Sequence, residues 1–543
     1  MRTPHASRAH LEVQRSGAGY VGIFRTSYRK GDKVYHEQCG RITGHSFGQL
    51  KLLQAAMRDE VVMKGSKDAS RSVGSREHGA SAALLALARE IELDTTIYSR
   101  PGEQWVKDCL AMIVGRAVYA GSKLALSRRW RSTTLWELCG IDGPVDVNTH
   151  CYASMDRLLS RQQGIQRTLA RRHLRGSTLV LYDITSSYFE GAYDESEIVT
   201  FGYNRDGKRG HEQMVIGLVC AGDGCPVGVE VFRGNTQDAS TVPGKIAEVR
   251  EKYGIEDIVF VGDRGMIAYG KGLDAATAAG MQTVSALTHR QMVKLLERGV
   301  LQMDLFDARE VVEVWDPEQP GLRYCLCKNP LTEAREQTTR KELLARTRKG
   351  LEALAKLTRR TAPEKIAARV GTLLAKTKMG KFVEWRMEKG QLVWSFDEEK
   401  IAAEGVFDGC YVVRSDVPAK QMDAREVVAS YKKLTAVEYA FRTMKTVQLE
   451  LRPVYHKTDD RIGCHVFVCM LGYYLMWHAL QRLAPVLKKH DGDPQTRWSI
   501  DYVMGRLKDI RKERRTAAGA VWHECTEPDD EQREILAALG VTV

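Results

Sequence analysis

The sequence predicts a multi-domain protein of the α/β class, and three observations carry this prediction. The chain has 543 residues, several times the length of an ordinary domain. Its first 175 residues show mainly helical patterns, whereas short apolar runs typical of buried strands begin near residue 178. Hydrophobic residues make up 43% and charged residues 28%, a normal composition for folded globular domains. We therefore expect a helical region followed by a sheet.

The α-rich N-terminal region should begin with a small β-hairpin. Residues 20–42 alternate apolar and polar positions around a Lys-Gly-Asp turn. Helical patterns follow at residues 46–62, 79–93, 101–120 and 149–172, and a Gly- and Ser-rich stretch at 65–75 separates the first two. The sequence thus predicts an N-terminal region that ends near residue 175.

The sheet is predicted from four apolar runs in the order β-β-β-α-β. The strands are expected at residues 178–184, 214–220, 227–232 and 258–262, with a helix at 243–253 that begins at Pro243. Asp183 and Asp263 follow the apolar runs LVLY and IVFVG, where strand ends in a parallel sheet open onto a crevice. Each aspartate alone is also explained as a turn or helix-capping residue. Two aspartates at the ends of two such apolar runs favour a site that they share.

A third carboxylate is predicted on a helix at residues 424–447. Tyr431, Leu434, Glu438, Arg442 and Lys445 follow one another at steps of three, four, four and three. At about 100° per residue, these positions share one face of a regular helix, so Glu438 would lie beside two cations. The alternative is a solvated ion pair of Glu438 with Arg442 or with a neighbouring residue.

Three carboxylates on two strand ends and a facing helix suit a site for two divalent metal ions acting on a phosphodiester. Mg²⁺ prefers oxygen ligands, so Asp183, Asp263 and Glu438 suffice without His or Cys. Arg442 and Lys445 would then hold phosphates. For Tyr431, stacking on a displaced base and half-buried packing are equally good interpretations.

Charge and composition narrow the class of protein. The net charge of +12 and the pI near 9.0 favour a polyanionic partner such as nucleic acid. Twelve cysteines without a CxxC pair argue against a zinc ribbon and against a disulfide-rich secreted fold. The start of the chain has no signal-peptide pattern, and the apolar run at 466–476 is too short to span a bilayer. We expect a cytoplasmic protein that has no contact with a membrane.

These residues resemble the DDE transposases of bacterial insertion sequences, specifically the insertion-sequence-four-type branch with a Tyr-Arg-Glu-Lys signature. Tyr431, Leu434, Glu438 and Lys445 have the spacing of that signature, with Leu434 in the place of the usual Arg. Lys432, Lys433 or Arg442 could supply the missing charge. Four further stretches look like this branch: YDITSSYFEG, the segment from GYNRDG to GNTQD, VGDRGM, and the segment from LRPVYH to MLGYYL. The resemblance extends from about residue 20 to residue 485.

The resemblance implies a ribonuclease-H-like core with Asp183, Asp263 and Glu438 as the catalytic, metal-binding triad. It also implies a β-rich and helical insertion between Asp263 and Glu438. Residues 309–328 and 381–396 have the pattern of strand pairs, and 331–378 that of helices. From residue 331 to residue 381 there are 14 Lys and Arg against 5 Asp and Glu, which indicates either phosphate contacts or a solvated helical hairpin.

The resulting division has five segments. It comprises a DNA-binding region at 1–175, the first part of the core at 176–290, a basic insertion at 291–408, the second part of the core at 409–490, and a tail, interpreted as helical, at 491–543.

The implied function is transposition of DNA. The enzyme would bind the terminal repeats of its element, hydrolyse phosphodiesters with two Mg²⁺ ions (or Mn²⁺), and join the 3′ hydroxyl ends to target DNA. Its partners would be double-stranded DNA and a second copy of the chain, as a homodimer on DNA. The resemblance also implies a location at the bacterial nucleoid. DNA contacts are expected from Tyr431, Lys432, Lys433, Arg442 and Lys445. Two alternatives are a ribonuclease-H-like nuclease without strand transfer and a catalytically silent DNA-binding regulator.

Overall fold

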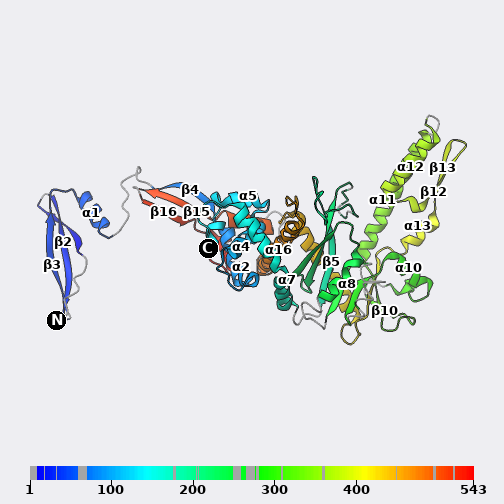
Figure 1. The fold of residues 1–543 in the computed structure, drawn as a ribbon, viewed down its shortest axis with the longest axis horizontal. Coiled ribbons are helices and arrows are strands. Elements are labelled where there is room, and N and C mark those ends of the chain that lie inside the picture. Colours follow the sequence, from blue (N-terminus) through cyan, green and yellow to red (C-terminus); the bar gives the residue numbers. More distant parts are fainter. Residues whose placement is uncertain are drawn as a thin grey trace. The chain divides into compact units, whose positions relative to one another are not determined.

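The computed structural model describes most of the chain in two compact units. One unit is Met1–Glu77 with Ile510–Glu527, and the other is His78–Asp509 with Pro528–Val543 (Figure 1). The described residues are 9–17, 19–31, 33–58, 70–174, 179–203, 205, 207–208, 210–248, 258–264, 276, 280–306, 310–357, 361–447, 449–492, 497–517 and 520–543.

The first unit contains the predicted hairpin as part of a three-stranded antiparallel sheet. Strands β2 (Gly19–Lys30) and β3 (Lys33–Ile42) form the hairpin, and β1 (His10–Ser16), which the sequence did not predict, pairs with β2. Helix α1 (Phe47–Ala56) begins with a Ser46 capping box and buries Leu50 against this sheet. The rest of the predicted helix beyond residue 58 lies outside the described residues.

A second three-stranded sheet in this unit joins distant parts of the chain. Strand β4 (Arg71–Glu77) pairs with β15 (Arg511–Ala517), which pairs in turn with β16 (Ala520–Cys525). The prediction of a spacer up to residue 75 was therefore wrong at its end, because residues 71–75 belong to β4. The region predicted as a tail contains these two strands and the helices α17 (Ile500–Lys508) and α18 (Asp530–Leu539).

Helices form one part of the second unit. Around the central helix α16 (Asp459–Lys489) pack α4 (Gln104–Tyr119), α7 (Ala153–His173), α2 (Gly79–Glu90) and α18. The smaller helices are α3 (Leu93–Ile97), α5 (Lys123–Arg128) and α6 (Leu135–Leu138). Among the described residues, α16 alone is a single helix apolar and long enough to cross a membrane, and 83% of its most apolar window is buried inside the protein. This burial is typical of a core helix, as predicted for 466–476.

A buried basic cluster lies between these helices. Lys123 Nζ is 3.1 Å from His465 Nδ1, and the ring of His456 contacts that of His465. Burial, with Lys123 as the second cause, lowers the pKa of His456 to about 3.

We expect acid to destabilise the second unit through His456. A neutral buried imidazole takes up its proton only near pH 3, whereas the unfolded chain takes it up near pH 6.5. The contribution of His456 to the free energy of unfolding is therefore fully present above pH 6.5. It falls by about 1.4 kcal/mol per pH unit as the pH drops towards 3. Urea denaturation from pH 6.5 to 4 should give a shallower pH slope for His456→Gln than for the wild type. An unchanged slope, equal to that of the exposed-residue control His523→Gln, would contradict this assignment.

The eight-stranded mixed sheet is the other part of the second unit. Its strand order is β10-β11-β14-β9-β8-β5-β6-β7. Strand β8 runs parallel to both β5 and β9, and the other neighbours are antiparallel. The strands are β5 (Leu179–Tyr188), β6 (Gln213–Ala221), β7 (Pro226–Arg233), β8 (Val259–Gly262), β9 (Gln282–Ala286), β10 (Val312–Trp315), β11 (Arg323–Lys328) and β14 (Cys410–Ser415). The prediction of a mixed α/β architecture is thus confirmed.

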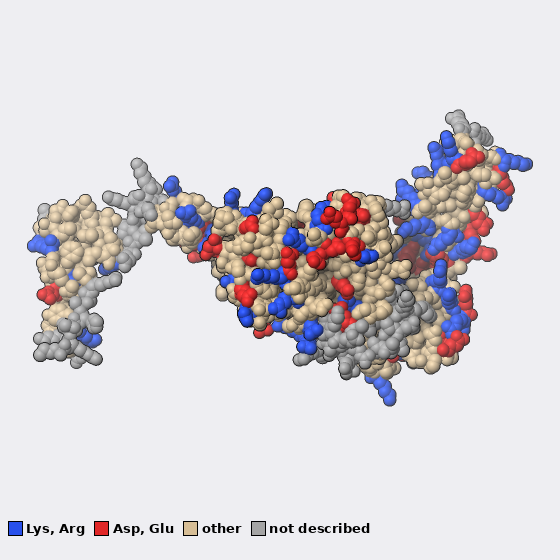
Figure 2. Space-filling model, viewed as in Figure 1, with Lys and Arg blue, Asp and Glu red and all other residues tan. Residues whose placement is uncertain are grey.

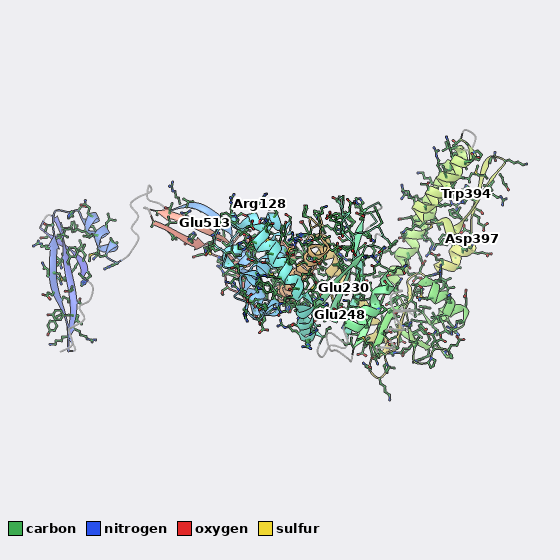
Figure 3. All side chains as sticks on the ribbon, in the orientation of Figure 1. Arg128, Glu230, Glu248, Trp394, Asp397 and Glu513 are labelled. Atoms are coloured by element: carbon green, nitrogen blue, oxygen red, sulfur yellow. The ribbon has the colours of Figure 1, made fainter. Side chains whose placement is uncertain are left out.

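Three details of this sheet differ from the prediction. Strand β5 does not end at Asp183 but continues to Tyr188, because its second half pairs fully with β6. Helix α8 (Asp238–Ala247) begins before Pro243, which lies inside it. The strand pair predicted at 309–328 is confirmed as β10 and β11, but both strands extend the main sheet through β14. In α8, Lys245 forms an ion pair with Glu230 at 2.7 Å and another with Glu248; both carboxylates are labelled in Figure 3.

A helical segment follows β11 and precedes β14. It comprises α11 (Pro330–Leu357), α12 (Pro363–Thr377), the hairpin of β12 (Val383–Glu388) and β13 (Gln391–Phe396), and α13 (Glu398–Gly405). Leu351, Ile366, Val370 and Leu392 belong to a small core of its own. Lys and Arg side chains are numerous on the surface of this segment (Figure 2). Helix α10 (His289–Glu297) lies between β9 and β10 in the chain.

Candidate active site

Asp183 and Asp263 occupy equivalent places on adjacent parallel strands. The register pairs Tyr182 of β5 with Gly262 of β8, and each aspartate is the next residue. Asp183 is half-buried, and its Oδ1 accepts a hydrogen bond of 2.8 Å from the Ile184 amide. Asp263 is exposed and directly follows β8. The parallel pairing therefore brings the two carboxylates to one level of the sheet.

Tyr431 fixes the carboxylate of Asp263. Helix α14 (Ala424–Lys432) begins with a capping box of Asp423 and Glu426 and packs on β8, β9 and β14. At its other end, the Tyr431 hydroxyl donates a hydrogen bond of 3.1 Å to Asp263 Oδ1. Burial and then the charge of Asp263 raise the pKa of Tyr431 well above its usual value, so the phenol keeps its proton and acts as a donor.

Glu438 comes to the same place from helix α15 (Leu434–Arg442). This helix packs on β5 and β6 through Leu434, Val437 and Phe441, which are buried, while Glu438 is exposed on the other side. Among the described residues, the Glu438 carboxylate has no hydrogen bond or ion pair, so the predicted alternative of a salt bridge with Arg442 does not form.

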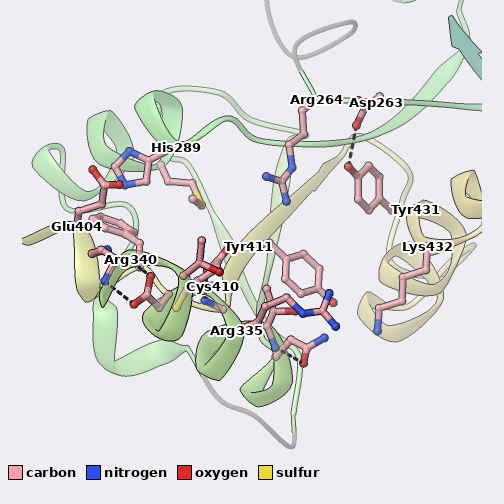
Figure 4. Close-up of a pocket in the computed structure, with 18 of the residues that line it drawn as sticks. Asp263, Arg264, His289, Arg335, Arg340, Glu404, Cys410, Tyr411, Tyr431 and Lys432 are labelled. Carbon is pink, nitrogen blue, oxygen red and sulfur yellow. Dashed lines mark hydrogen bonds and ion pairs between the residues drawn. The ribbon is translucent and has the colours of Figure 1, made fainter. Parts of the chain in front are cut away.

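The three carboxylates line one cavity of about 770 Å³. Its wall also contains Arg264, Arg335, Tyr411, Tyr431 and Lys432. In Figure 4, Arg264 reaches into the cavity next to Tyr431, whose hydroxyl meets Asp263. Arg340 of α11 and Asp408 are far from Asp263 in the sequence. They form an ion pair with each other, and both line the same cavity. Negative and positive side chains thus line the same cavity.

The structure separates the residues predicted to contact DNA. Tyr431 and Lys432 line the cavity. Lys433 and Arg442 are exposed on the surface and are not among the described residues that line it. Lys445 is buried, and its Nζ donates a hydrogen bond of 2.6 Å to the Thr185 hydroxyl, two residues beyond Asp183 on β5.

The prediction of a single regular helix at 424–447 was wrong. A break at Lys433 separates α14 from α15, and a π-helical turn (Thr443–Val447) follows α15. This turn changes the helical period after Arg442, and Lys445 donates to Thr185 of β5 and is not among the described residues that line the cavity with Glu438. Leu434, in the place of the usual Arg, is buried.

Arg264 and Arg335 were not singled out from the sequence. Arg264 directly follows Asp263, so its position beside the predicted carboxylate was a signal that could have been used. Arg335 lies in the basic stretch at 331–381, but only the tertiary contact of α11 with Gly409, whose amide donates a hydrogen bond of 2.9 Å to Glu336, brings this part of α11 to the cavity.

Three carboxylates and several cations thus line one cavity beside a mixed α/β sheet, and carboxylates grouped in this way are suitable ligands for the divalent ions used in phosphate-ester chemistry. A comparison with protein-family models identifies the family. The transposase DDE domain matches residues 176–475, more than half of the chain, and this range contains Asp183, Asp263 and Glu438. The chain therefore belongs to the transposase DDE domain family, which confirms the prediction of a DDE transposase. No curated protein sequence matches the chain.

Proposed function

We propose that this protein is the transposase of a bacterial insertion sequence of the insertion-sequence-four-type branch. It binds the ends of its element, hydrolyses phosphodiesters there, and joins the 3′ hydroxyl ends to target DNA. The observation that carries the proposal is the meeting of Asp183, Asp263 and Glu438 in one cavity, from three separate elements. The family membership supports a transposase-type nuclease that acts on DNA.

The donor set of the cavity suits divalent metal ions. Enzymes of this family generally use them, and Asp183, Asp263 and Glu438 offer the hard oxygen ligands that Mg²⁺ and Mn²⁺ prefer. Glu438 suits this role because its carboxylate is exposed in the cavity and has no partner among the described residues. When bound, two such ions activate the attacking oxygen and stabilise the leaving oxygen.

The other residues of the cavity position DNA and the carboxylates. Tyr431 orients Asp263 through its hydrogen bond and keeps one carboxylate oxygen engaged. Arg264 and Lys432 supply the positive charge for phosphates that Leu434 lacks. Lys445 acts through Thr185 on the strand that carries Asp183, as a positioning residue. Hydrolysis frees a 3′ hydroxyl, and this hydroxyl attacks the target phosphodiester in the same cavity.

The remaining parts of the proposal concern the domains. We assign the sheet β9-β8-β5-β6-β7 with α15 to a ribonuclease-H-like core, since the carboxylates lie on its central strands and on a facing helix. The segment from α11 to α13, with its own small core and its basic surface, is the insertion and contacts DNA phosphates. The region 1–175 binds the element ends, a homodimer brings two ends together, and the enzyme works in the cytoplasm.

An assay of cleavage and joining tests the proposed function. Purified protein is incubated with duplexes that carry the terminal repeats flanking its gene, with Mg²⁺ or Mn²⁺, and with a supercoiled target plasmid. Joined products support a transposase. Cleavage without joining would instead assign a nuclease without strand transfer. Binding of the repeats without either reaction would assign a DNA-binding regulator.

We expect Tyr431→Phe to weaken the response to metal ions. Loss of the hydroxyl frees Asp263 to rotate, and removal of such a partner of a metal ligand lowers metal affinity by about 10- to 100-fold. A Mg²⁺ titration of the cleavage rate should shift to higher concentrations, with most of the rate regained at saturation. Tyr439→Phe, on the exposed side of α15, is the matched control and should leave the titration unchanged. Equal titration curves for both variants would show that Tyr431 only packs.

A further inference from the structure

A cluster of two histidines and a cysteine lies apart from the carboxylate cavity. His173 is the last residue of α7, Cys225 lies in the turn between β6 and β7, and His478 lies on α16. One ligand atom from each residue lies within 4.8 Å of those of the other two. Helices α7 and α16 pack against each other and against β7, the strand that directly follows Cys225.

The ligand atoms of this cluster are available. His478 Nε2 is buried and has no hydrogen-bond partner in the described part of the chain, which is costly for an imidazole unless something else binds there. His173 Nε2 is 3.0 Å from the Tyr474 hydroxyl, so its Nδ1 remains for a ligand. The Cys225 thiol has one long contact of 4.0 Å to the Pro226 carbonyl oxygen.

The surroundings hold the three side chains in place. The bond between His173 and Tyr474 orients one ring, as a second hydrogen bond does for most metal-binding histidines. The Cys225 amide donates a hydrogen bond of 3.0 Å to Asp223 Oδ1, which fixes the turn. Trp477 and Tyr474 pack edge-on against the His478 ring.

We propose that His173, Cys225 and His478 form a second metal site, which binds one Zn²⁺ ion with solvent in the fourth position. Thiolate and imidazole ligands select Zn²⁺ over Mg²⁺, so the site is chemically distinct from the carboxylate cavity. The ligand atoms of a tetrahedral zinc site lie about 3.3–3.8 Å apart. In this cluster they lie within 4.8 Å of one another, so small rotations of the three side chains would bring them to the distances of a zinc site. Binding releases the thiol proton of Cys225 to solvent.

The ion would join distant parts of the chain. His173 lies shortly before β5, which carries Asp183, whereas His478 lies on α16, after the whole sheet. The turn that carries Cys225 also lies close to α15. A Cβ added at Gly224 would be only 2.9 Å from the Cβ of Ala436, which is two residues before Glu438. The zinc site therefore ties α7 and α16 to the turn that supports the Glu438 helix.

Metal analysis of the untagged full-length protein tests this site. Protein expressed with added Zn²⁺ and dialysed should contain about one zinc ion per chain, and Cys225→Ser and His478→Gln should contain almost none. The Co²⁺-substituted protein should show a thiolate-to-cobalt absorption band that Cys225→Ser loses. Cys220→Ser, a buried cysteine outside the cluster, is the matched control and should keep both the zinc and the band.

The wild-type protein decides the question even where a variant does not fold. A wild type with no zinc above background, or with zinc that persists equally in folded Cys225→Ser and His478→Gln, would overturn the proposal and leave the cluster as aromatic and thiol packing. The site does not rest on the proposed catalytic function. Asp183→Asn, which removes a carboxylate of the cavity, should keep its zinc, so failure of either proposal is seen separately.

Discussion

Asp183→Asn is expected to lower the rate of strand cleavage by on the order of 10³-fold or more, with DNA binding retained. The amide has nearly the shape of the carboxylate but lacks the charge that holds a divalent cation. Asp183 is paired with Leu218 of β6 and directly follows Tyr182, the last residue of β5 that pairs with β8, so its backbone is held in place and cannot shift to bring another ligand. Glu438→Gln should have the same effect from the facing helix. Both rates are measured with terminal-repeat duplexes in Mg²⁺.

Two exposed carboxylates outside the cavity lining serve as controls for this result. Asp304→Asn and Glu352→Gln make the same chemical changes and should leave the cleavage rate within a factor of about two of the wild type. Cleavage that survives Asp183→Asn at the level of Asp304→Asn would remove Asp183 from the catalytic site.

Arg340→Leu is expected to destabilise the protein by about 3–5 kcal/mol, since it leaves the Asp408 carboxylate buried without its cation. The Asp408 side chain is 4% exposed, and the Arg340 guanidinium donates to it from two nitrogens, one of them at 2.8 Å. The hydrogen bond to Asp408 raises the pKa of Arg340, consistent with a tight pair. Urea denaturation and hydrogen exchange of the α11 amides measure the loss.

Two further variants separate the buried charge from the loss of packing. Arg340→Leu/Asp408→Asn should regain most of the stability, because no charge is then left unpaired. Arg386→Leu removes an arginine from an exposed pair with Glu388 and should cost no more than about 1 kcal/mol. A double variant as unstable as Arg340→Leu would place the cost in packing and not in the charge of Asp408.

Local sequence patterns were enough to predict much of the sheet and the place of Asp263. The run IVFVG is short, apolar and followed at once by Asp263, so the end of β8 is visible in the sequence. The end of β5 is not visible, because polar residues after Asp183 become buried only by pairing with β6. The alternation of apolar and polar residues that is typical of a half-buried strand is absent from this part of the sequence.

The site could be predicted as far as regular geometry holds. Tyr431 and Glu438 reach the cavity as the helical spacing indicates. Lys445 does not, because a π-helical turn after Arg442 changes the period, and no local pattern signals such a turn. Arg335 depends on packing between segments that are far apart in the chain, which a pattern within one segment cannot reveal.

The pairing of β4 with β15 sets the order in which a nascent chain can complete its structure. The register joins Glu77 to Arg511, more than four hundred residues later. At roughly 5–20 residues per second, a ribosome needs tens of seconds to make β15 after β4 has been synthesised. Until then β4 lacks its partner, and an unpaired strand edge invites pairing with other chains. A chain that ends before Arg511 keeps this edge of β4 unpaired, so we expect such a chain to aggregate more readily than the full-length protein.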